Sequence, residues 1–379
     1  MIPALQTLIR GNPMNLKFFL TLLVLIVSFI NSGYSKDDER RYELNFVEFE
    51  SFGEGLVGAY SYAFGINDHG EVVGRASLST TIPNETPISR PFIWLPEPQY
   101  GLDFGVHRLQ GLHDYEERPN DTIHLSQLTS ISNNGVSVGY SYVSGGIYHA
   151  TFWENNELYD IGSLGGVSAA RDINENGLVT GQTQISYQGL ETFVYDINTD
   201  IMESIGVPNP NTYSHSFGKA INDWGDIVGQ GYIPFQYGQA YIYFQEPSYS
   251  FEEGFHLLPW LVGYRHSSTA ADINNRSQVV GNSKGDYVQG ARVSRPFLWL
   301  PEAAYGLSSG MHNLGTLPGS NYSSAQALNE KGQIVGVSKY APVSEGISHG
   351  FLWYKGEIID LHLLLPEGLG WVSTFPKNI

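Results

Sequence analysis

The sequence contains no cysteine among its 379 residues. Disulfide bonds, lipid attachment through cysteine and thiolate chemistry are therefore excluded, so packing and hydrogen bonding must hold the fold together. Basic residues are also scarce, with 20 Lys and Arg against 38 Asp and Glu, which gives a net charge of −18. Such an acidic chain is a poor partner for nucleic acid or an anionic membrane, and the charge favours solubility.

Long apolar runs are missing apart from Phe18–Ile30. This run is too short to span a bilayer as a helix, which needs about 20 residues. It follows Lys17 and precedes the small residues Gly33 and Ser35, the layout of a secretory signal peptide. We therefore predict a signal peptide over residues 1–35, with Met14 as a second possible start, and a secreted or periplasmic protein without a stable membrane span after cleavage. The alternative is an uncleaved anchor.

An amphipathic helical pattern is missing as well, and a repeat stands in its place. Six segments align without gaps on the pattern Ile-Asn-x-x-Gly-x-Val-Val-Gly, beginning at residues 66, 131, 173, 221, 273 and 328. Repeats at such spacing are typical of propellers and solenoids. Asn or Asp followed by Gly forms a tight turn, and β-branched residues flank it, so each copy predicts a β-hairpin. Ser277 replaces the turn glycine in the fifth copy, where we expect a distorted turn.

An aromatic segment follows each hairpin, as in Pro91–Trp94, and then a fourth short strand, as in Leu158–Ile161. Four antiparallel strands per repeat predict the blade of a propeller. We predict a charged linker over residues 36–41 and then a single domain, residues 42–379. Its expected fold is an all-β propeller of four-stranded antiparallel blades, with six full repeats. Tyr42–Glu50 and Gly370–Phe375 resemble pieces of a seventh blade, most of which is missing under our hypothesis; the alternative is a six-bladed ring with two loose edge strands.

These residues resemble the HAF-type extracellular repeats of bacterial exported proteins. In that family, His-Ala-Phe-Leu-Trp and then a Leu-Gly-x-Leu-Gly-Gly segment follow the hairpin. His349-Gly-Phe351 is close to the naming tripeptide, Arg90 and Arg295 replace its histidine in two copies, and Ile161–Gly166 carries the last element. The resemblance extends over nearly all of residues 42–375. It implies a secreted β-propeller and no established activity.

In a four-stranded meander, the turns between strands 1 and 2 and between strands 3 and 4 lie on one face of the ring, here the turn face. Three repeats share a linker there in which a Glu precedes a Tyr by three residues: Glu97 and Tyr100, Glu246 and Tyr249, Glu302 and Tyr305. These side chains either form a ring of contacts for a glycan or peptide or pack within their own loops. Self-packing is favoured, because a repeated loop usually serves folding.

The opposite face, here the loop face, carries the loops between strands 2 and 3 and the connections between blades. These loops differ between repeats, and binding residues concentrate in such loops. The candidate ligand-binding residues, rich in aromatic rings and carboxylates suited to sugars, are Tyr115, Glu116, Glu117, Tyr213, Trp260, Tyr264, Arg265, His266, Asp286, Tyr287 and Tyr340. We predict no cofactor and no metal. Asp172–Gly177 matches the start of a calcium loop, but Thr183 stands where a bidentate Glu is needed.

The favoured function is that of an exported, non-catalytic binding or structural module whose partner is a glycan, a peptide or a surface polymer. One alternative is a glycan-active hydrolase or lyase, for which Glu116, Glu117 and Asp286 are the best carboxylates. Two of them would have to converge to about 5–10 Å. Another alternative is an adhesion or assembly module whose open blade edge pairs with a second chain.

Overall fold

The computed structural model describes residues 60–78, 88–112, 126–186, 189–234, 237–288, 291–340, 347–365 and 371–379, and the backbone of three earlier strands. These strands are β1 (Leu5–Arg10), β2 (Leu22–Phe29) and β3 (Tyr42–Phe49). Regular structure in the described residues is β-strand except for one 3-10 turn, η2 (Leu361–Leu364). No helix in this part of the chain is long and apolar enough to cross a membrane. The predicted all-β class is confirmed.

Each repeat forms four antiparallel strands that pair in sequence order. We number the resulting sheets one to six along the chain. Sheet one holds β4 (Tyr60–Ile66), β5 (Val72–Leu78), β6 (Ile88–Leu95) and β7 (Gly105–Arg108), and sheet two holds β8 (Ser126–Ile131), β9 (Ser137–Ser144), β10 (Ile147–Glu154) and β11 (Glu157–Gly162). Sheet three holds β12 (Ser168–Ile173), β13 (Leu178–Ser186), β14 (Gly189–Asp196) and β15 (Ile201–Gly206), and sheet four holds β16 (His215–Ile221), β17 (Ile227–Tyr232), β18 (Gln239–Phe244) and β19 (Gly254–Leu257). Sheet five holds β20 (Ser267–Ile273), β21 (Val279–Val288), β22 (Ala291–Leu300) and β23 (Gly310–Asn313), and sheet six holds β24 (Ser320–Leu328), β25 (Ile334–Tyr340), β26 (Ser348–Tyr354) and β27 (Glu357–Asp360).

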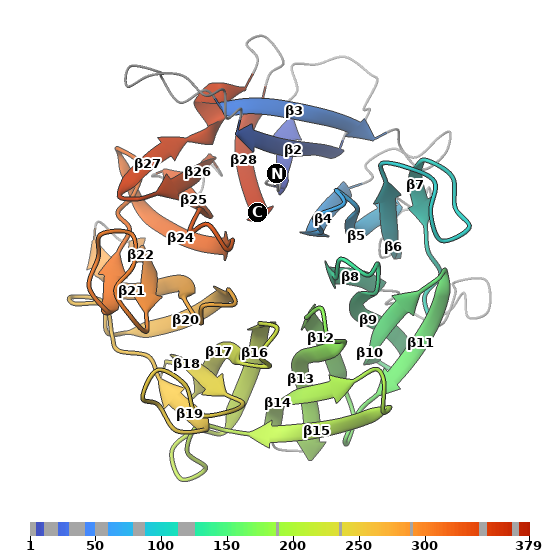
Figure 1. The fold of residues 1–379 in the computed structure, drawn as a ribbon, viewed down its shortest axis with the longest axis horizontal. Helices are drawn as coiled ribbons and strands as arrows, with labels where there is room; N and C mark the ends of the chain where they lie inside the picture. The colour runs from blue at the N-terminus through green and yellow to red at the C-terminus, as the bar shows by residue number, and fades with distance from the viewer. Residues whose placement is uncertain are drawn as a thin grey trace.

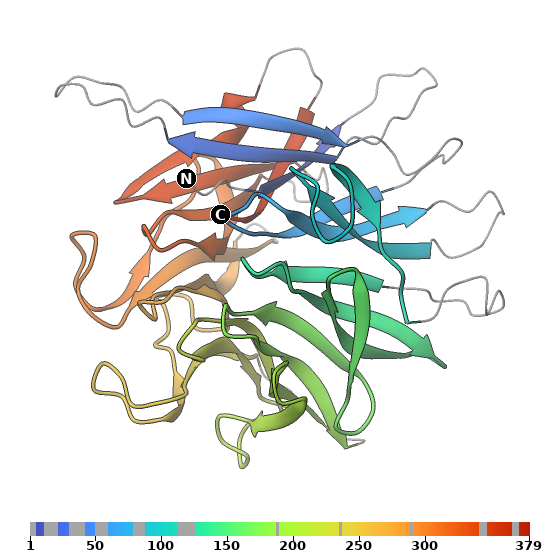
Figure 2. The same ribbon diagram turned by 45° about the vertical axis from the view of Figure 1, so that its right-hand side comes forward.

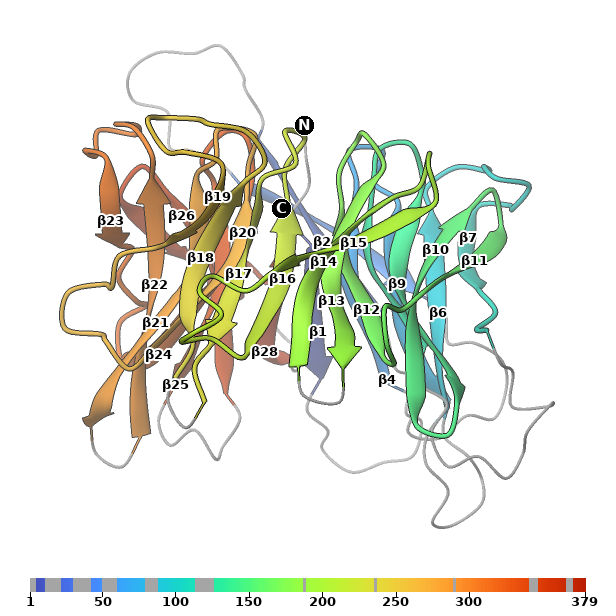
Figure 3. The ribbon, with the colours of Figure 1, turned by 90° about the horizontal axis from the view of Figure 1, so that it is seen from below.

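The sheets stand side by side around a common axis, with the first strand of each sheet innermost (Figure 1). Seen from the side, the strands run roughly along this axis, and their connections gather at two opposite faces (Figure 3). A single parallel bridge, Ser294 with Tyr322, links sheets five and six. The arrangement is propeller-like, as the repeat predicted.

Strands from the two ends of the chain lie between sheets six and one (Figures 1 and 2). The last strand, β28 (Trp371–Asn378), pairs with β1 and contacts β25 and β26 on one side and β4 on the other. Strand β2 pairs with β3. Both β1 and β2 fall within the residues predicted to be a signal peptide.

The hydrophobic core lies between neighbouring sheets. One cluster joins Val228 and Ile242 of sheet four to Ile273, Phe297 and Trp299 of sheet five, and similar clusters join other neighbouring sheets. The second strand of a sheet packs on both of its faces, which is why it reads as a continuous apolar run. In keeping with that prediction, consecutive valines at 72 and 73 and again at 279 and 280 are fully buried.

Every innermost strand carries a β-bulge two residues before the repeated Ile or Leu. The bulge residues are Phe64, Thr129, Arg171, Lys219, Ala271 and Gln326. Opposite each bulge stands the glycine that ends the repeat pattern, and a Cβ at Gly181 would lie only 2.0 Å from the carbonyl oxygen of Ala169. The close approach of the strands beside the bulge therefore explains why the repeat pattern ends in glycine. The bulge also exposes one side chain per sheet near the axis.

Candidate functional site

The asparagine of the repeat organises each turn between strands 1 and 2. In sheet four, Oδ1 of Asn222 accepts hydrogen bonds from the N–H groups of Trp224 and Asp226, and its Nδ2 donates to the carbonyl oxygen of Asn274 in sheet five. The predicted hairpins are confirmed in all six sheets. The expected distortion at Ser277 is not found, because this serine adopts φ +50° and keeps the turn hydrogen bond to Asn274.

A second row of hydrogen bonds joins the same turns one residue further on. Here the backbone N–H of each turn donates to a side chain of the next turn around the ring: Asp68 to Asn133, Asn133 to Glu175, Glu175 to Asp223, Asp223 to Asn275 and Asn275 to Glu330. Carboxylate and amide oxygens on this part of the turn face are thus engaged in bonds between sheets. The repeat motif is therefore a structural element that joins neighbouring sheets.

The tyrosines of the repeated linker also face neighbouring turns. Tyr305 donates its hydroxyl hydrogen to Oε1 of Gln278, and Tyr100 donates to Oε2 of Glu71. Burial, followed by the charge of Glu71, raises the pKa of Tyr100 to about 12. Tyr249 donates to the carbonyl oxygen of Arg276 in the next sheet. These contacts favour self-packing over ligand contact for the tyrosines.

The glutamates of the linker behave differently from its tyrosines. Glu97, Glu246 and Glu302 are exposed and make no hydrogen bond within the described ranges. A histidine completes each linker instead, since the imidazoles of His107, His256 and His312 each hydrogen-bond a carbonyl oxygen four residues earlier. The repeated histidine therefore serves the loop, and the glutamates contribute surface charge.

Several of the predicted loop-face residues do come together, between sheets four and five. Trp260, Tyr264, Arg265 and His266 lie on the connection that leads into β20, and Asp286 and Tyr287 lie near the end of β21. The N–H of His266 donates to the carbonyl oxygen of Lys284, which fixes the connection beside that strand. Nε2 of His266 lies 2.6 Å from Oδ1 of Asp286.

Two further residues complete this group. The ring of Tyr237 meets the imidazole of His266 edge-on at 5.5 Å, and the guanidinium of Arg295 lies 5.6 Å above the ring of Tyr264. We call Tyr237, Tyr264, His266, Asp286, Tyr287 and Arg295 the loop-face cluster. Sequence reasoning missed Tyr237 as a site residue, and it treated Arg295 only as a variant of the naming tripeptide.

The loop-face cluster offers exposed aromatic and charged surface. Tyr287 and Tyr237 are 65% and 47% exposed, so aromatic surface is available beside the His266–Asp286 pair. The Asp286 carboxyl is 88% exposed and thus hydrated. No group of three or more His, Cys, Asp or Glu in the described residues is arranged to hold a metal ion.

Other predicted ligand-binding residues lie elsewhere. Tyr213 is 6% exposed, and its hydroxyl hydrogen-bonds Gln239, so its ring packs in the interior. Tyr340 lies in sheet six, 4.8 Å from the ring of His349 and apart from the loop-face cluster. Tyr115, Glu116 and Glu117 fall outside the described residues.

The histidines of the naming tripeptide pair with strand 4 of their own sheets. Nδ1 of His349 lies 2.8 Å from Oδ2 of Asp360, and Nδ1 of His149 lies 3.0 Å from Oδ2 of Asp160. Each aspartate also accepts a hydrogen bond from the backbone N–H two residues later. The pairs therefore fix the end of strand 4, a structural reason for the histidine.

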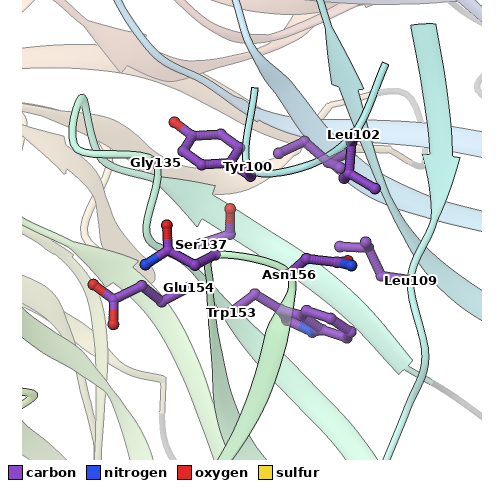
Figure 4. Close-up of a pocket in the computed structure, with 10 residues that line it drawn as sticks. Tyr100, Leu102, Leu109, Gly135, Ser137, Trp153, Glu154 and Asn156 are labelled. Atoms are coloured by element: carbon purple, nitrogen blue, oxygen red, sulfur yellow. The ribbon is translucent and has the colours of Figure 1, made fainter. Parts of the chain in front are cut away.

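A cavity of about 20 Å³ lies between sheets one and two (Figure 4). Its walls include the side chains of Ile93, Leu102, Leu109 and Trp153, next to the ring of Tyr100. A space of this size holds one water molecule at most. It is a packing gap and offers no room for a ligand.

Comparisons with known proteins leave the activity of this chain open. A family model described as "Protein of unknown function (DUF3466)" matches residues 109–239. No match is found among the curated proteins. One similar solved structure is TolB from Acinetobacter baumannii, with 11% identity and a TM-score of 0.41 over 72% of this chain and 59% of that one. A puromycin hydrolase variant complexed with PGG has 10% identity and a TM-score of 0.45 over 78% of this chain and 45% of that one. A levansucrase variant from B. megaterium has 9% identity and a TM-score of 0.35 over 84% of this chain and 86% of that one. The chain spans about half the length of the first two. At such scores and identities, these similarities say nothing of what this chain binds or does.

Proposed function

We propose that this chain is an exported, non-catalytic β-propeller that binds a glycan outside the cytoplasm through its loop-face cluster. The observation that carries the proposal is the gathering of exposed tyrosine rings around a His–Asp pair beside the hydrogen-bonded strands of sheets four and five. Sugar rings stack on aromatic faces, and their hydroxyls hydrogen-bond to imidazole, carboxylate and guanidinium groups. Binding sites of this type are commonly built on loops that a stable scaffold positions.

The contacts of the cluster support a preformed site. His266 is fixed from two sides, by its backbone bond to Lys284 and its side-chain bond to Asp286. Tyr264 packs against Gly285, where a Cβ would lie 2.8 Å from the ring. The protein would therefore lose little conformational entropy when a ligand binds.

Ring closure is the second part of the proposal. The contacts of β28 with sheets six and one support a closed propeller whose last sheet is built from the two ends of the chain. Export with removal of residues 1–35 would take β1 and β2 away and leave β3 and β28 for that sheet. The mass of the protein recovered from the periplasm or the medium tests the cleavage, and an intact N-terminus in the exported protein would contradict it.

A thermal-unfolding screen of the exported protein with bacterial and plant polysaccharides tests the binding. A ligand present at about 100 times its dissociation constant adds about 2.7 kcal/mol of stability. We expect Tyr287→Ala to weaken binding at least tenfold, which is about 1.4 kcal/mol. Phe104→Ala is the matched control, since this ring is also 65% exposed and belongs to the linker of the turn face.

Three outcomes would count against the proposal. If no polysaccharide stabilises the protein, glycan binding is wrong. If Tyr287→Ala and Phe104→Ala weaken binding equally, the loop-face cluster is not the site. If the bound polysaccharide is shortened, the protein is an enzyme, and the hydrolase or lyase alternative takes the place of a binding module.

A further inference from the structure

Positive side chains gather near the axis of this acidic protein. Arg75 on β5, Arg171 on β12 and Lys219 on β16 come from three different sheets, and Tyr140 on β9 lies among them. All four side chains are half-buried. Arg171 and Lys219 are bulge residues of innermost strands, which explains how a strand in the core exposes them.

Arg171 links the members of this group. Its guanidinium lies 5.7 Å above the ring of Tyr140 in sheet two, while its Nε donates a hydrogen bond to Oε1 of Gln182. Gln182 thus holds the guanidinium of Arg171 by its Nε edge, and Tyr140 covers one of its faces. The Nη atoms of Arg171 make no hydrogen bond within the described residues. A guanidinium held in this way presents a free pair of donors.

Arg75, whose charge also acts on Tyr140, is held in a similar manner. Its guanidinium carbon lies 5.1 Å from the ring centre of Tyr62 and 5.9 Å from that of Phe64. One Nη donates to Oε1 of Gln127, whereas Nε is buried without an acceptor. A cation with an unsatisfied buried donor is stabilised by any acceptor that reaches it.

Lys219 has no hydrogen bond or ion pair among the residues that the structure describes. Burial, followed by the positive charge of Arg171, lowers the pKa of Lys219 to about 8. Both effects disfavour the ammonium form, and no carboxylate offsets them. The half-buried amine therefore lacks a counter-charge.

Two acidic side chains of the inner strands are engaged elsewhere. Asp172 on β12 accepts hydrogen bonds from the hydroxyl of Ser130 and the N–H of Ile221. Asp272 on β20 accepts from the N–H groups of Ile273 and Leu328. The hydrogen bonds of both carboxyls therefore go to other partners, and neither carboxyl pairs with Arg171 or Lys219 among the residues that the structure describes.

We propose that Arg171, Lys219 and Tyr140 form a binding site near the axis for a small oxyanion, the carboxylate of a sugar acid or a phosphate group. Guanidinium, ammonium and phenol groups supply donors from three sheets, and Arg75 adds positive charge. An oxyanion would accept from the free Nη donors of Arg171 and from Lys219, and it would remove the repulsion between the two charges. The site is separate from the loop-face cluster and does not depend on the proposed function.

Calorimetric titration of the full chain at pH 8 with sodium phosphate, and separately with sodium glucuronate, tests the proposal. Anion binding favours the ammonium form of Lys219, so we expect proton uptake, seen as a dependence of the binding heat on the ionisation heat of the buffer. Lys219→Met should weaken binding at least tenfold and abolish the proton uptake. Lys331→Met is the control for net charge, because this lysine is exposed in a turn.

The two anions distinguish the sources of the ligand. Binding of both supports an oxyanion site, and binding of glucuronate alone supports a sugar-acid site. Thermal unfolding without added anion serves as a folding check, and Lys219→Met should unfold at a higher temperature than the parent because it lacks an uncompensated charge. The proposal is overturned if neither anion binds, or if Lys219→Met and Lys331→Met weaken binding equally.

Discussion

The side-chain amide of Asn222 donates a hydrogen bond to the carbonyl oxygen of Asn274, 3.3 Å away in the neighbouring sheet. The same bond joins Asn67 to Ser132 at 3.0 Å, Asn174 to Asn222 at 2.9 Å and Asn274 to Asn329 at 3.3 Å. The residue that defines the repeat therefore closes its own turn and ties its sheet to the next. In repeat proteins such nearest-neighbour contacts contribute much of the stability.

Replacing Asn222 by alanine should destabilise the fold by about 2–4 kcal/mol. The side chain is 3% exposed, and its removal leaves the N–H groups of Trp224 and Asp226 without their acceptor. Urea unfolding of the two proteins measures the difference. Asn211→Ala is the control, since that side chain is exposed, and a loss equal to the control would show that the asparagine row contributes nothing.

Ser132 interrupts the asparagine row, because no bond from its side chain to sheet three is present. Ser132→Asn should restore the donor and raise the free energy of unfolding by about 1 kcal/mol. The neighbouring turn shows that the geometry is feasible, since Asn174 makes this bond with an apolar Leu178 four residues later. A lower unfolding midpoint in urea for Ser132→Asn would indicate that the serine is required by packing.

The contact between Tyr305 and Gly332 gives a prediction for the repeated linker. A Cβ on Gly332 would lie 2.1 Å from the ring of Tyr305, whereas one on Gly356 would meet nothing within 4 Å. Both glycines have positive φ, +76° and +89°, so an alanine at either position pays the same kind of backbone strain, about 1 kcal/mol.

Gly332→Ala should therefore cost about 1–3 kcal/mol more than Gly356→Ala, because only the former displaces an aromatic ring. Thermal or urea unfolding of both variants measures this difference. Adding Tyr305→Leu to Gly332→Ala should recover part of the excess. Equal costs at the two glycines would mean that the tyrosine ring moves aside freely and does not pack the sheets.

The fold was largely predictable because its signals are local. An Asx turn followed by a glycine needs no distant partner, and six aligned copies of the repeat pattern indicated the position of each hairpin in the sequence. The prediction of a distorted turn at Ser277 was wrong because the fold imposes φ +50° on that serine. Its hydroxyl donates to Asp226 in the previous sheet. A contact between residues 51 positions apart has no local signal.

The candidate sites were less predictable for the same reason. Trp260, Tyr264 and His266 were correctly assigned to one loop, but their approach to Asp286 depends on the path of the connection beside β21. The burial of Tyr213 could not be predicted, because an aromatic ring in a polar loop looks the same in sequence whether it points inward or outward. Arg171 and Lys219 carried one usable signal, their position two residues before the repeated isoleucine, which becomes meaningful only once the bulge is known.

The last prediction concerns Asp272 and pH. Burial, followed in effect by the charge of Asp172, raises the pKa of Asp272 to about 7, whereas an aspartate in an unfolded chain titrates near pH 3.9. The folded state therefore binds the proton more tightly than the unfolded state. The stability gained from this proton is fully present below about pH 4 and is lost as the pH rises through 7.

Asp272→Asn removes this titration while keeping an oxygen that can accept from the N–H of Leu328. Between pH 5 and 7, the parent protein should lose up to about 1.4 kcal/mol per pH unit relative to the variant, and above pH 8 the difference should level off. Urea unfolding at pH 5, 6, 7 and 8 measures it, with Asp103→Asn as the exposed control. Parallel curves for parent and Asp272→Asn would show that Asp272 is already ionised at pH 5, in which case its two backbone hydrogen bonds outweigh the cost of burying its charge.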